Sequence, residues 1–226
     1  MNPAAVAGVV QRWREPAVRA LSRILPFDVL CFVDTAAPAV ALTFDDGPHP
    51  GTTPQLLDVL AAHGAKATFF LIGERIPGNE PIVARIAAEG HELANHGMRE
   101  ERAVLLPDGE LRRDLAAVNA LLSPYGAVRW FRPGAGWFTP RMLRSAARLD
   151  LRVTLGTAVA MHTGGPGDAG IARGLLAGLR PGSIIVLHEG GDARRGVAAT
   201  TDEFLTGLAG RGLTAVTVSQ LVALSR

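Results

Sequence analysis

Short, almost wholly apolar segments recur along the chain, and longer amphipathic segments separate them. Apolar runs of four or five residues that are bounded by glycine, proline or charged residues are typical of buried strands. The amphipathic segments space their apolar residues as helices do, and several begin at a proline or end at a glycine. Strands are predicted over residues 40–44, 67–71, 92–95, 128–131, 152–155, 183–187 and 214–218, and helices over residues 54–63, 81–89, 109–122, 140–149, 170–179 and 201–209.

The alternation of strand and helix indicates an α/β fold. Strands that are apolar on both faces pair in parallel and are covered by helices. Units of this kind either close into a barrel or form an open doubly wound sheet, and the periodicity does not choose between them. In both architectures the functional side chains follow the carboxyl ends of the strands.

The composition fits one main domain. The 226 residues are 48% hydrophobic and 19% charged, which allows a sizeable core. We expect residues 33–226 to form a single domain and residues 1–32 to form a helical extension packed on it. Arginines interrupt the apolar residues of this extension, which fits an amphipathic helix; a membrane-surface anchor is the alternative.

Charge, cysteine content and hydropathy exclude several classes of protein. The net charge of +2 is too small to favour nucleic-acid binding. No apolar run is long enough to predict an integral membrane span, and the N-terminal segment lacks the apolar core of a signal peptide. A cytoplasmic protein is therefore expected, with peripheral association with the cell envelope as the alternative. Cys31 is the only cysteine, so an intrachain disulfide and a cysteine zinc site are excluded. No feature specifies an oligomeric state.

The first candidate for chemistry is a pair of carboxylates at the end of a predicted strand. Segment 43–50 reads TFDDGPHP, so Asp45 and Asp46 end the strand and a Gly-Pro turn follows. Adjacent carboxylates repel each other unless a proton or a cation lies between them. One of the two could bind a metal while the other acts as a base. The alternative is an ordinary turn with solvated aspartates.

The second candidate follows the predicted strand 92–95. Segment 90–100 reads GHELANHGMRE. His96 and Glu100 are four residues apart, so one helical turn would place both on the same face. This spacing suits two ligands of one metal. The alternative is a solvated histidine beside a charged surface.

Two further predicted strands end in residues suited to catalysis. Arg132 begins the segment RPGAGW, where its fork of donors could orient a carboxylate and the glycine-rich turn could offer a backbone N–H, such as that of Ala135, to an oxyanion. Trp137 could cover the apolar face of a ligand or belong to the core. His188 follows a wholly apolar strand, where a catalytic acid and a buried structural histidine are comparable readings.

Together these segments resemble the polysaccharide deacetylases of carbohydrate esterase family 4, which are related to the nodulation-type chitooligosaccharide deacetylases. The resemblance runs from about residue 39 to the end of the chain and rests above all on the TFDDGP segment. It implies a distorted, incomplete (β/α) barrel of about seven parallel strands and a catalytic domain over residues 33–226. The resemblance also implies a set of roles: Asp45 as the base, Arg132 as its partner, Asp46 and His96 as metal ligands, His188 as the acid and Leu187 in the acetyl pocket.

The chain departs from the family pattern in two places. Glu100 stands where a second histidine is usual, so it is either a replacement ligand or a sign of lost activity. The motif that normally supports the catalytic histidine is unrecognisable around residues 154–163, where His162 is a weak candidate. Zinc is the first expectation for the metal, but a site of two carboxylates and one imidazole is harder and more anionic than one with two imidazoles, which favours manganese, iron or cobalt as alternatives.

These residues predict a metal-dependent hydrolase that removes acetyl groups from an N-acetylated amino sugar or a related carbohydrate. A metal-activated water would attack, with an aspartate base and a histidine acid. The acetylated carbohydrate is the expected partner. Two rival functions remain open: a C–N hydrolase for a non-carbohydrate amide, and a catalytically impaired sugar-binding relative.

Overall fold

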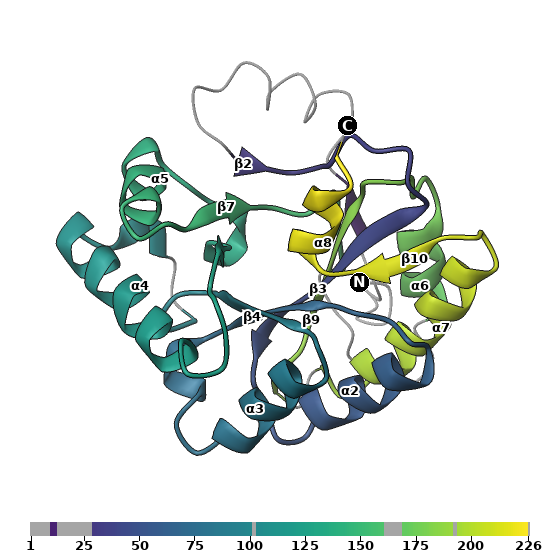
Figure 1. Ribbon diagram of the computed structural model, residues 1–226, viewed down its shortest axis with the longest axis horizontal. Coiled ribbons are helices and arrows are strands. Elements are labelled where there is room, and N and C mark those ends of the chain that lie inside the picture. Colours follow the sequence, from purple (N-terminus) through teal and green to yellow (C-terminus); the bar gives the residue numbers. More distant parts are fainter. Residues whose placement is uncertain (1–9, 13–28, 101–102, 161–168, 192–193, 226) are drawn as a thin grey trace, which may run out of the picture.

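The fold was analysed in a computed structural model, which describes residues 10–12, 29–100, 103–160, 169–191 and 194–225 (Figure 1). Its strands form one curled sheet in the order β1-β8-β9-β3-β4-β5-β6-β7-β2, with β10 also paired to β3. Neighbouring strands are parallel except β1 and β8. The strands are β1 (Val10–Arg12), β2 (Val29–Leu30), β3 (Ala39–Gly47), β4 (Thr68–Leu71), β5 (Glu92–Asn95), β6 (Trp130–Phe131), β7 (Arg152–Thr154), β8 (Ala158–Ala160), β9 (Ile184–His188) and β10 (Thr214–Val216).

The described strands leave the barrel open, because β1 and β2 are the two ends of the sheet and do not pair with each other. The predicted distorted, incomplete (β/α) barrel is therefore confirmed. All seven predicted strands are present, as β3, β4, β5, β6, β7, β9 and β10. The three that were not predicted, β1, β2 and β8, have only two or three residues each, too few for a periodic pattern.

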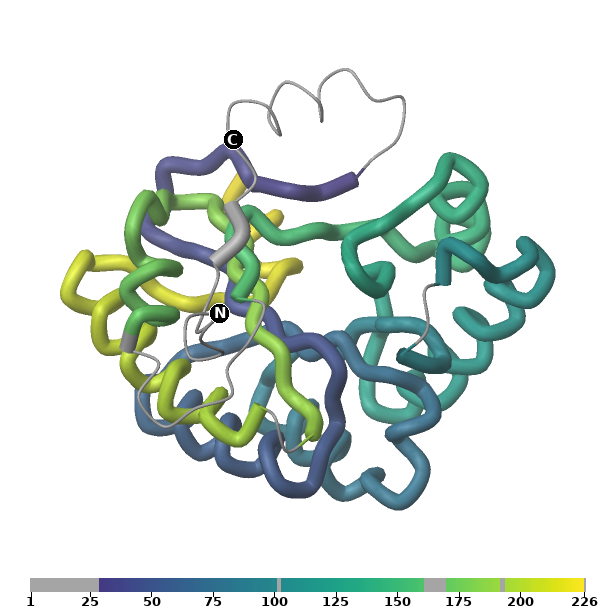
Figure 2. Tube along the Cα trace, turned by 180° about the vertical axis from the view of Figure 1, so that it is seen from behind, coloured from purple at the N-terminus to yellow at the C-terminus, as the bar shows by residue number. Residues whose placement is uncertain are grey.

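Helices surround the outer face of the curled sheet (Figure 1), as the view from behind also shows (Figure 2). Thr139 caps α5 by accepting a hydrogen bond from the N–H of Met142 at 3.2 Å. Gly64 and Gly90 follow α2 and α3 with φ of 61° and 78°, a left-handed conformation that favours glycine. The helices are α2 (Thr53–Ala62), α3 (Glu80–Ala88), α4 (Asp108–Leu122), α5 (Pro140–Ala147), α6 (Ala169–Leu176), α7 (Val197–Ala209) and α8 (Val218–Ala223), with 3₁₀ turns η2 (Gly73–Arg75), η3 (Ala103–Leu105) and η4 (Gly134–Gly136).

The short helix α8 closes the amino-terminal end of the barrel. Val218 and Leu221 pack with Ala41, Phe70 and Ile184 in the barrel interior. A capping box formed by Thr217 and Gln220 begins this helix. The sequence pattern did not predict α8, because its first residue was assigned to the preceding strand. With this end filled, the carboxyl ends of the strands are where a ligand could enter.

The N-terminal segment differs in part from its prediction. Residues 10–12 were expected in a helical extension but form β1, which pairs antiparallel with β8, and residues 29–30 form β2 beside β7. Pairing to exposed sheet edges overrides local helical periodicity here. The other residues of the predicted extension, up to residue 28, lie outside the described part of the chain. No helix among the described residues is long and apolar enough to cross a membrane.

Candidate active site

A local distortion of β3 turns two adjacent carboxylates into the same cleft. Successive side chains of a strand point to opposite faces, so Asp45 and Asp46 would normally diverge. Asp46 has a φ of 71°, and the pairing with β4 shifts register between Asp45 and Gly47. Both carboxylates line one cleft of about 610 Å³ at the carboxyl ends of the strands. The predicted pair is thus a shared site rather than a solvated turn.

Asp45 is held by Arg132. One guanidinium nitrogen, Nη1, donates to Asp45 Oδ1 at 2.6 Å and to Thr43 Oγ1 at 2.8 Å. Both charged side chains are buried, and the guanidinium also lies over the ring of Phe70, 4.0 Å from its centroid. The arginine partner keeps the buried carboxylate in a fixed orientation. A general base needs a fixed orientation of this kind.

Asp46 and His96 face each other in the cleft. The Nδ1 of His96 lies 2.7 Å from the carbonyl oxygen of Arg132, which can only accept, so Nδ1 carries a proton. The other nitrogen, Nε2, is 3.1 Å from Asp46 Oδ1. In a neutral imidazole, a lone pair then faces a carboxylate, and this arrangement suits two ligands of one cation.

The pKa values of His96 and Asp46 show that a positive charge beside Asp46 is favourable. Burial alone would lower the pKa of His96, but the charges of Asp45 and Asp46 and the hydrogen bond to Asp46 raise it. Burial alone would raise the pKa of Asp46, but the hydrogen bond with His96 and the charges of His96, His188 and Arg194 hold it well below its usual range. A proton on His96 supplies the charge that a metal would supply at the same place.

Glu100 lines the same cleft, but its carboxylate is not grouped with Asp46 and His96 as a third ligand. Its carboxylate Oε2 pairs with Arg75 Nη2 at 2.5 Å, and its side chain is 56% exposed. The described residues contain no group of three histidine, cysteine, aspartate or glutamate side chains arranged to hold a metal. Asp46 and His96 therefore fit as two ligands, and Glu100 as the third stays a prediction.

His188 stands at the end of β9, directly opposite Asp45 in the parallel pairing of β3 and β9. Its Nδ1 lies 2.9 Å from the carbonyl oxygen of Ala160, so Nδ1 donates and Nε2 is the nitrogen that can exchange a proton. A main-chain carbonyl of β8 thus orients this histidine in the region where the supporting motif was unrecognisable. His162, the weak candidate of that region, lies outside the described residues.

The glycine-rich turn after β6 forms one side of the cleft. Ala135 has a φ of 56°, and within the described part of the chain its N–H has no acceptor, so it is open to a ligand oxygen. Trp137 lines the same cleft and is 65% exposed, which excludes the core reading. Both predicted positions therefore lie where a substrate could reach them.

The predicted position of Leu187 is wrong. Its side chain is fully buried on the outer face of the sheet, in the apolar layer beneath the helices. Because side chains alternate along β9, Val186 and His188 face the cleft instead. Leu155 and Val159 join Val186 as apolar lining.

Three buried or charged residues beside the candidate site were not singled out in the sequence. Arg194 donates to Asp46 Oδ2 and, at 2.7 Å, to the carbonyl of Glu189. Arg75 donates to the carbonyl of Asp46 as well as to Glu100. Glu189 is fully buried, and Thr52 and Thr53 donate to its Oε2 at 3.1 and 2.5 Å. Arginines without a fixed spacing from the motifs gave no sequence signal.

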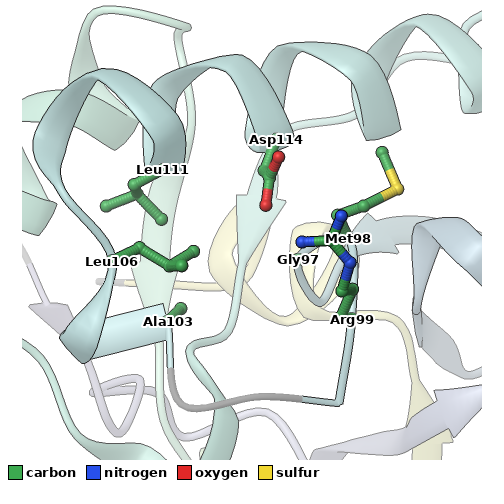
Figure 3. Close-up of a pocket in the computed structure, with 7 residues that line it drawn as sticks. All are labelled: Gly97, Met98, Arg99, Ala103, Leu106, Leu111 and Asp114. Carbon is green, nitrogen blue, oxygen red and sulfur yellow. The ribbon is translucent and has the colours of Figure 1, made fainter.

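A second, much smaller cavity lies beside the segment that carries Glu100. Leu106 and Leu111 border it on one side, Arg99 on the other, and Asp114 of α4 points toward it (Figure 3). Its volume of about 10 Å³ is on the order of one water molecule. The larger cleft is therefore the candidate binding site.

The chain is similar to known proteins. The family model for polysaccharide deacetylase matches residues 32–154. A chitooligosaccharide deacetylase of Sinorhizobium fredii is 37% identical over 159 residues, which cover 69% of this chain and 74% of that protein. A peptidoglycan-N-acetylglucosamine deacetylase of Bacillus cereus is 32% identical over 189 residues, covering 81% and 87%.

Solved structures give the same result. A crystal structure of a peptidoglycan N-acetylglucosamine deacetylase superposes with a TM-score of 0.81 at 27% identity, covering 91% of this chain and 98% of that one. A family 4 acetyl xylan esterase from Clostridium thermocellum, solved with a cobalt ion, gives a TM-score of 0.76 at 29% identity, covering 82% and 91%.

Proposed function

The chain belongs to the polysaccharide deacetylase family, and from this premise we propose that it removes acetyl groups from an N-acetylated amino sugar or a related carbohydrate by metal-dependent hydrolysis. One observation carries the proposal. The pairs Asp45–Arg132 and Asp46–His96 lie in one cleft, with His188 opposite Asp45. A base, a cation-binding pair and an acid are the three elements that metal-dependent hydrolysis of an amide uses.

Asp46 and His96 would hold the metal, and Glu100 is proposed as the third ligand once it leaves Arg75. A divalent metal in this position lowers the pKa of a water and polarises the acetyl carbonyl. Zinc is the first candidate, and the two carboxylates make manganese, iron and cobalt stronger alternatives than they would be at a site with two imidazoles.

Residues of the protein itself have separate roles in the proposed reaction. Asp45, ionised and oriented by Arg132, takes the proton of the attacking water. The N–H of Ala135 donates to the oxyanion that forms on the acetyl carbonyl. His188, held at Nδ1 by the carbonyl of Ala160, gives the proton on Nε2 to the leaving amine nitrogen. Without that proton an amine leaves poorly.

The cleft lining fits an acetylated sugar. Val186, Val159 and Leu155 offer apolar surface to the acetyl methyl group, in place of Leu187. The exposed ring of Trp137 could pack on the apolar face of a sugar. These contacts would select for the acetyl group more strongly than for the sugar that carries it.

The test is release of acetate from N-acetylated chitooligosaccharides by the full chain. Chelator treatment should abolish the release, and zinc should restore it; Asp45→Asn, which keeps the shape of the cleft, is the matched inactive control. Release that chelation leaves unchanged would reject the metal-dependent mechanism. Turnover of simple N-acetyl amides without turnover of the sugars would indicate a C–N hydrolase for a non-carbohydrate substrate.

One observation favours a second function, a catalytically impaired sugar-binding relative: Arg75 engages Glu100. A site with two protein ligands binds a metal more weakly than a site with three. Metal analysis of the purified protein separates the two functions. Sugar binding without stoichiometric metal and without acetate release would support the binding protein.

A further inference from the structure

Three carboxylates at the cleft each face their own guanidinium group. This balances the charge of the site before any metal is bound, so a metal must compete with an arginine for at least one carboxylate. The pairs are Asp45–Arg132 at 2.6 Å, Asp46–Arg194, and Glu100–Arg75 at 2.5 Å.

Arg75 differs from the other two because it contacts two parts of the candidate metal site. Its Nη1 donates to the carbonyl of Asp46, and its Nη2 donates to the carboxylate of Glu100. Arg75 ends η2, directly after β4, the strand that pairs with β3 at Asp45. The guanidinium group of Arg75 therefore lies between Glu100, the proposed third ligand, and the main chain of Asp46, the residue that faces His96.

We propose that Arg75 competes with the metal for Glu100 and so decides whether the metal has two protein ligands or three. The inference rests on the proposed function, since it assumes that Asp46 and His96 bind a divalent cation. The Glu100 side chain is 56% exposed and that of Arg75 is 26% exposed. An ion pair at this exposure is weak, whereas a carboxylate bound to a divalent ion is strongly held, so exchange of partners is favourable when the ion arrives.

A double-mutant cycle with metal affinity as the readout tests this competition. Zinc is titrated by calorimetry into chelator-treated wild type, Arg75→Met, Glu100→Ala and the double variant. We expect Arg75→Met to tighten zinc binding about tenfold or more when Glu100 is present, the scale of effects from neighbours of metal ligands. With alanine at position 100 the same change should give a clearly smaller gain, because only the loss of one positive charge remains. Arg75→Met also removes the hydrogen bond to the Asp46 carbonyl, but this loss occurs in both backgrounds and cancels in the cycle.

Arg99→Met is the matched control. Arg99 adjoins Glu100 in the sequence, lines the same cleft and is exposed. Its removal lowers the positive charge equally, so it should change zinc affinity by the same factor in both backgrounds. If Arg75→Met also gives equal factors, the competition is refuted while the metal site stands. If no variant binds zinc, manganese or cobalt, the proposed function falls, and the inference falls with it. Should Arg75→Met fail to fold, Arg75→Gln removes the charge, keeps a donor for the Asp46 carbonyl and answers the same question.

Discussion

Asp45 and His188 stand directly opposite each other on the parallel strands β3 and β9. Both side chains fall on the inner face of the curled sheet and line the cleft. The base and the acid of the proposed reaction therefore approach the same space from adjacent strands. Each is held from its far side, Asp45 by Arg132 and His188 by the carbonyl of Ala160. Their separate roles can be tested by separate substitutions.

Asp45→Asn should retain bound metal and lose turnover by about 100-fold or more, the typical effect of removing a general base. The amide keeps the size of the carboxylate and can still accept a hydrogen bond from Arg132, so Asp46 and His96 should stay in place. Metal content and acetate release are measured on the same preparation. Turnover near that of wild type would refute the role of Asp45.

His188→Ala should harm the hydrolysis of an N-acetyl amino sugar more than the hydrolysis of an activated acetyl ester. The amine needs a proton in order to leave, whereas an activated alkoxide or phenolate does not. The ratio of kcat values on the two substrates, wild type against variant, measures this difference. Equal losses would indicate that His188 supports the structure instead.

Glu100→His should retain metal, bind it more tightly than Glu100→Ala does, and keep or increase activity. Histidine supplies a third ligand without a charge that Arg75 can pair with, and the loss of one negative charge strengthens the metal as a Lewis acid. Metal titration and acetate release are compared for the two variants and wild type. Identical affinities of wild type and Glu100→Ala would exclude Glu100 as a ligand.

Gly47→Ala should destabilise the protein by about 1–3 kcal/mol, the usual cost of forcing atoms into a packed site. A Cβ on Gly47 would overlap Oε1 of the buried Glu189 and stand 3.1 Å from Leu71 Cδ2. Gly51→Ala in the same turn is the control, because its Cβ would meet only the ring of His49, at 3.2 Å. Urea denaturation measures the free energy of unfolding of both variants. Equal values would contradict the close contact between position 47 and Glu189.

The strands and most of the site could be predicted because they depend on local patterns. Asp45, Asp46, His96, Arg132 and His188 each follow an apolar strand, and parallel strands bring their carboxyl ends to one edge. Placement of these five residues needed only strand order along the chain.

The remaining features depend on contacts between distant segments. Leu187 was predicted to face the cleft. Side chains alternate along β9 and His188 faces the cleft, so the residue directly before His188 points to the outer face. The support of His188 by Ala160 uses a main-chain carbonyl, which any residue could provide. The pairing of Glu100 with Arg75 joins residues 25 positions apart on different loops. None of these leaves a periodic or spaced signal in the sequence.

Glu189→Gln should remove a pH dependence of stability between about pH 5 and pH 7. Burial raises the pKa of Glu189 from 4.5 to about 7, and the charge of Asp46 adds to this, against the hydrogen bonds from Thr52 and Thr53 and the charge of Arg75. The folded protein therefore holds a proton that the unfolded chain has released in this range. Its stabilising contribution is complete below pH 4.5 and is lost as the pH rises through 7, a loss on the order of 3 kcal/mol.

The wild-type curve alone does not isolate this contribution, because His91 acts in the opposite direction. Burial lowers the pKa of His91 to about 4, so stability falls as the pH drops below 6.5. The difference between wild type and Glu189→Gln cancels the His91 contribution, since both proteins keep that residue. Urea denaturation in chelator at pH 5, 6, 7 and 8 should show this difference shifting in favour of Glu189→Gln as the pH rises. Parallel curves would mean that Glu189 is ionised in the folded protein throughout, and that its unpaired Oε1 carries a buried charge beside Gly47.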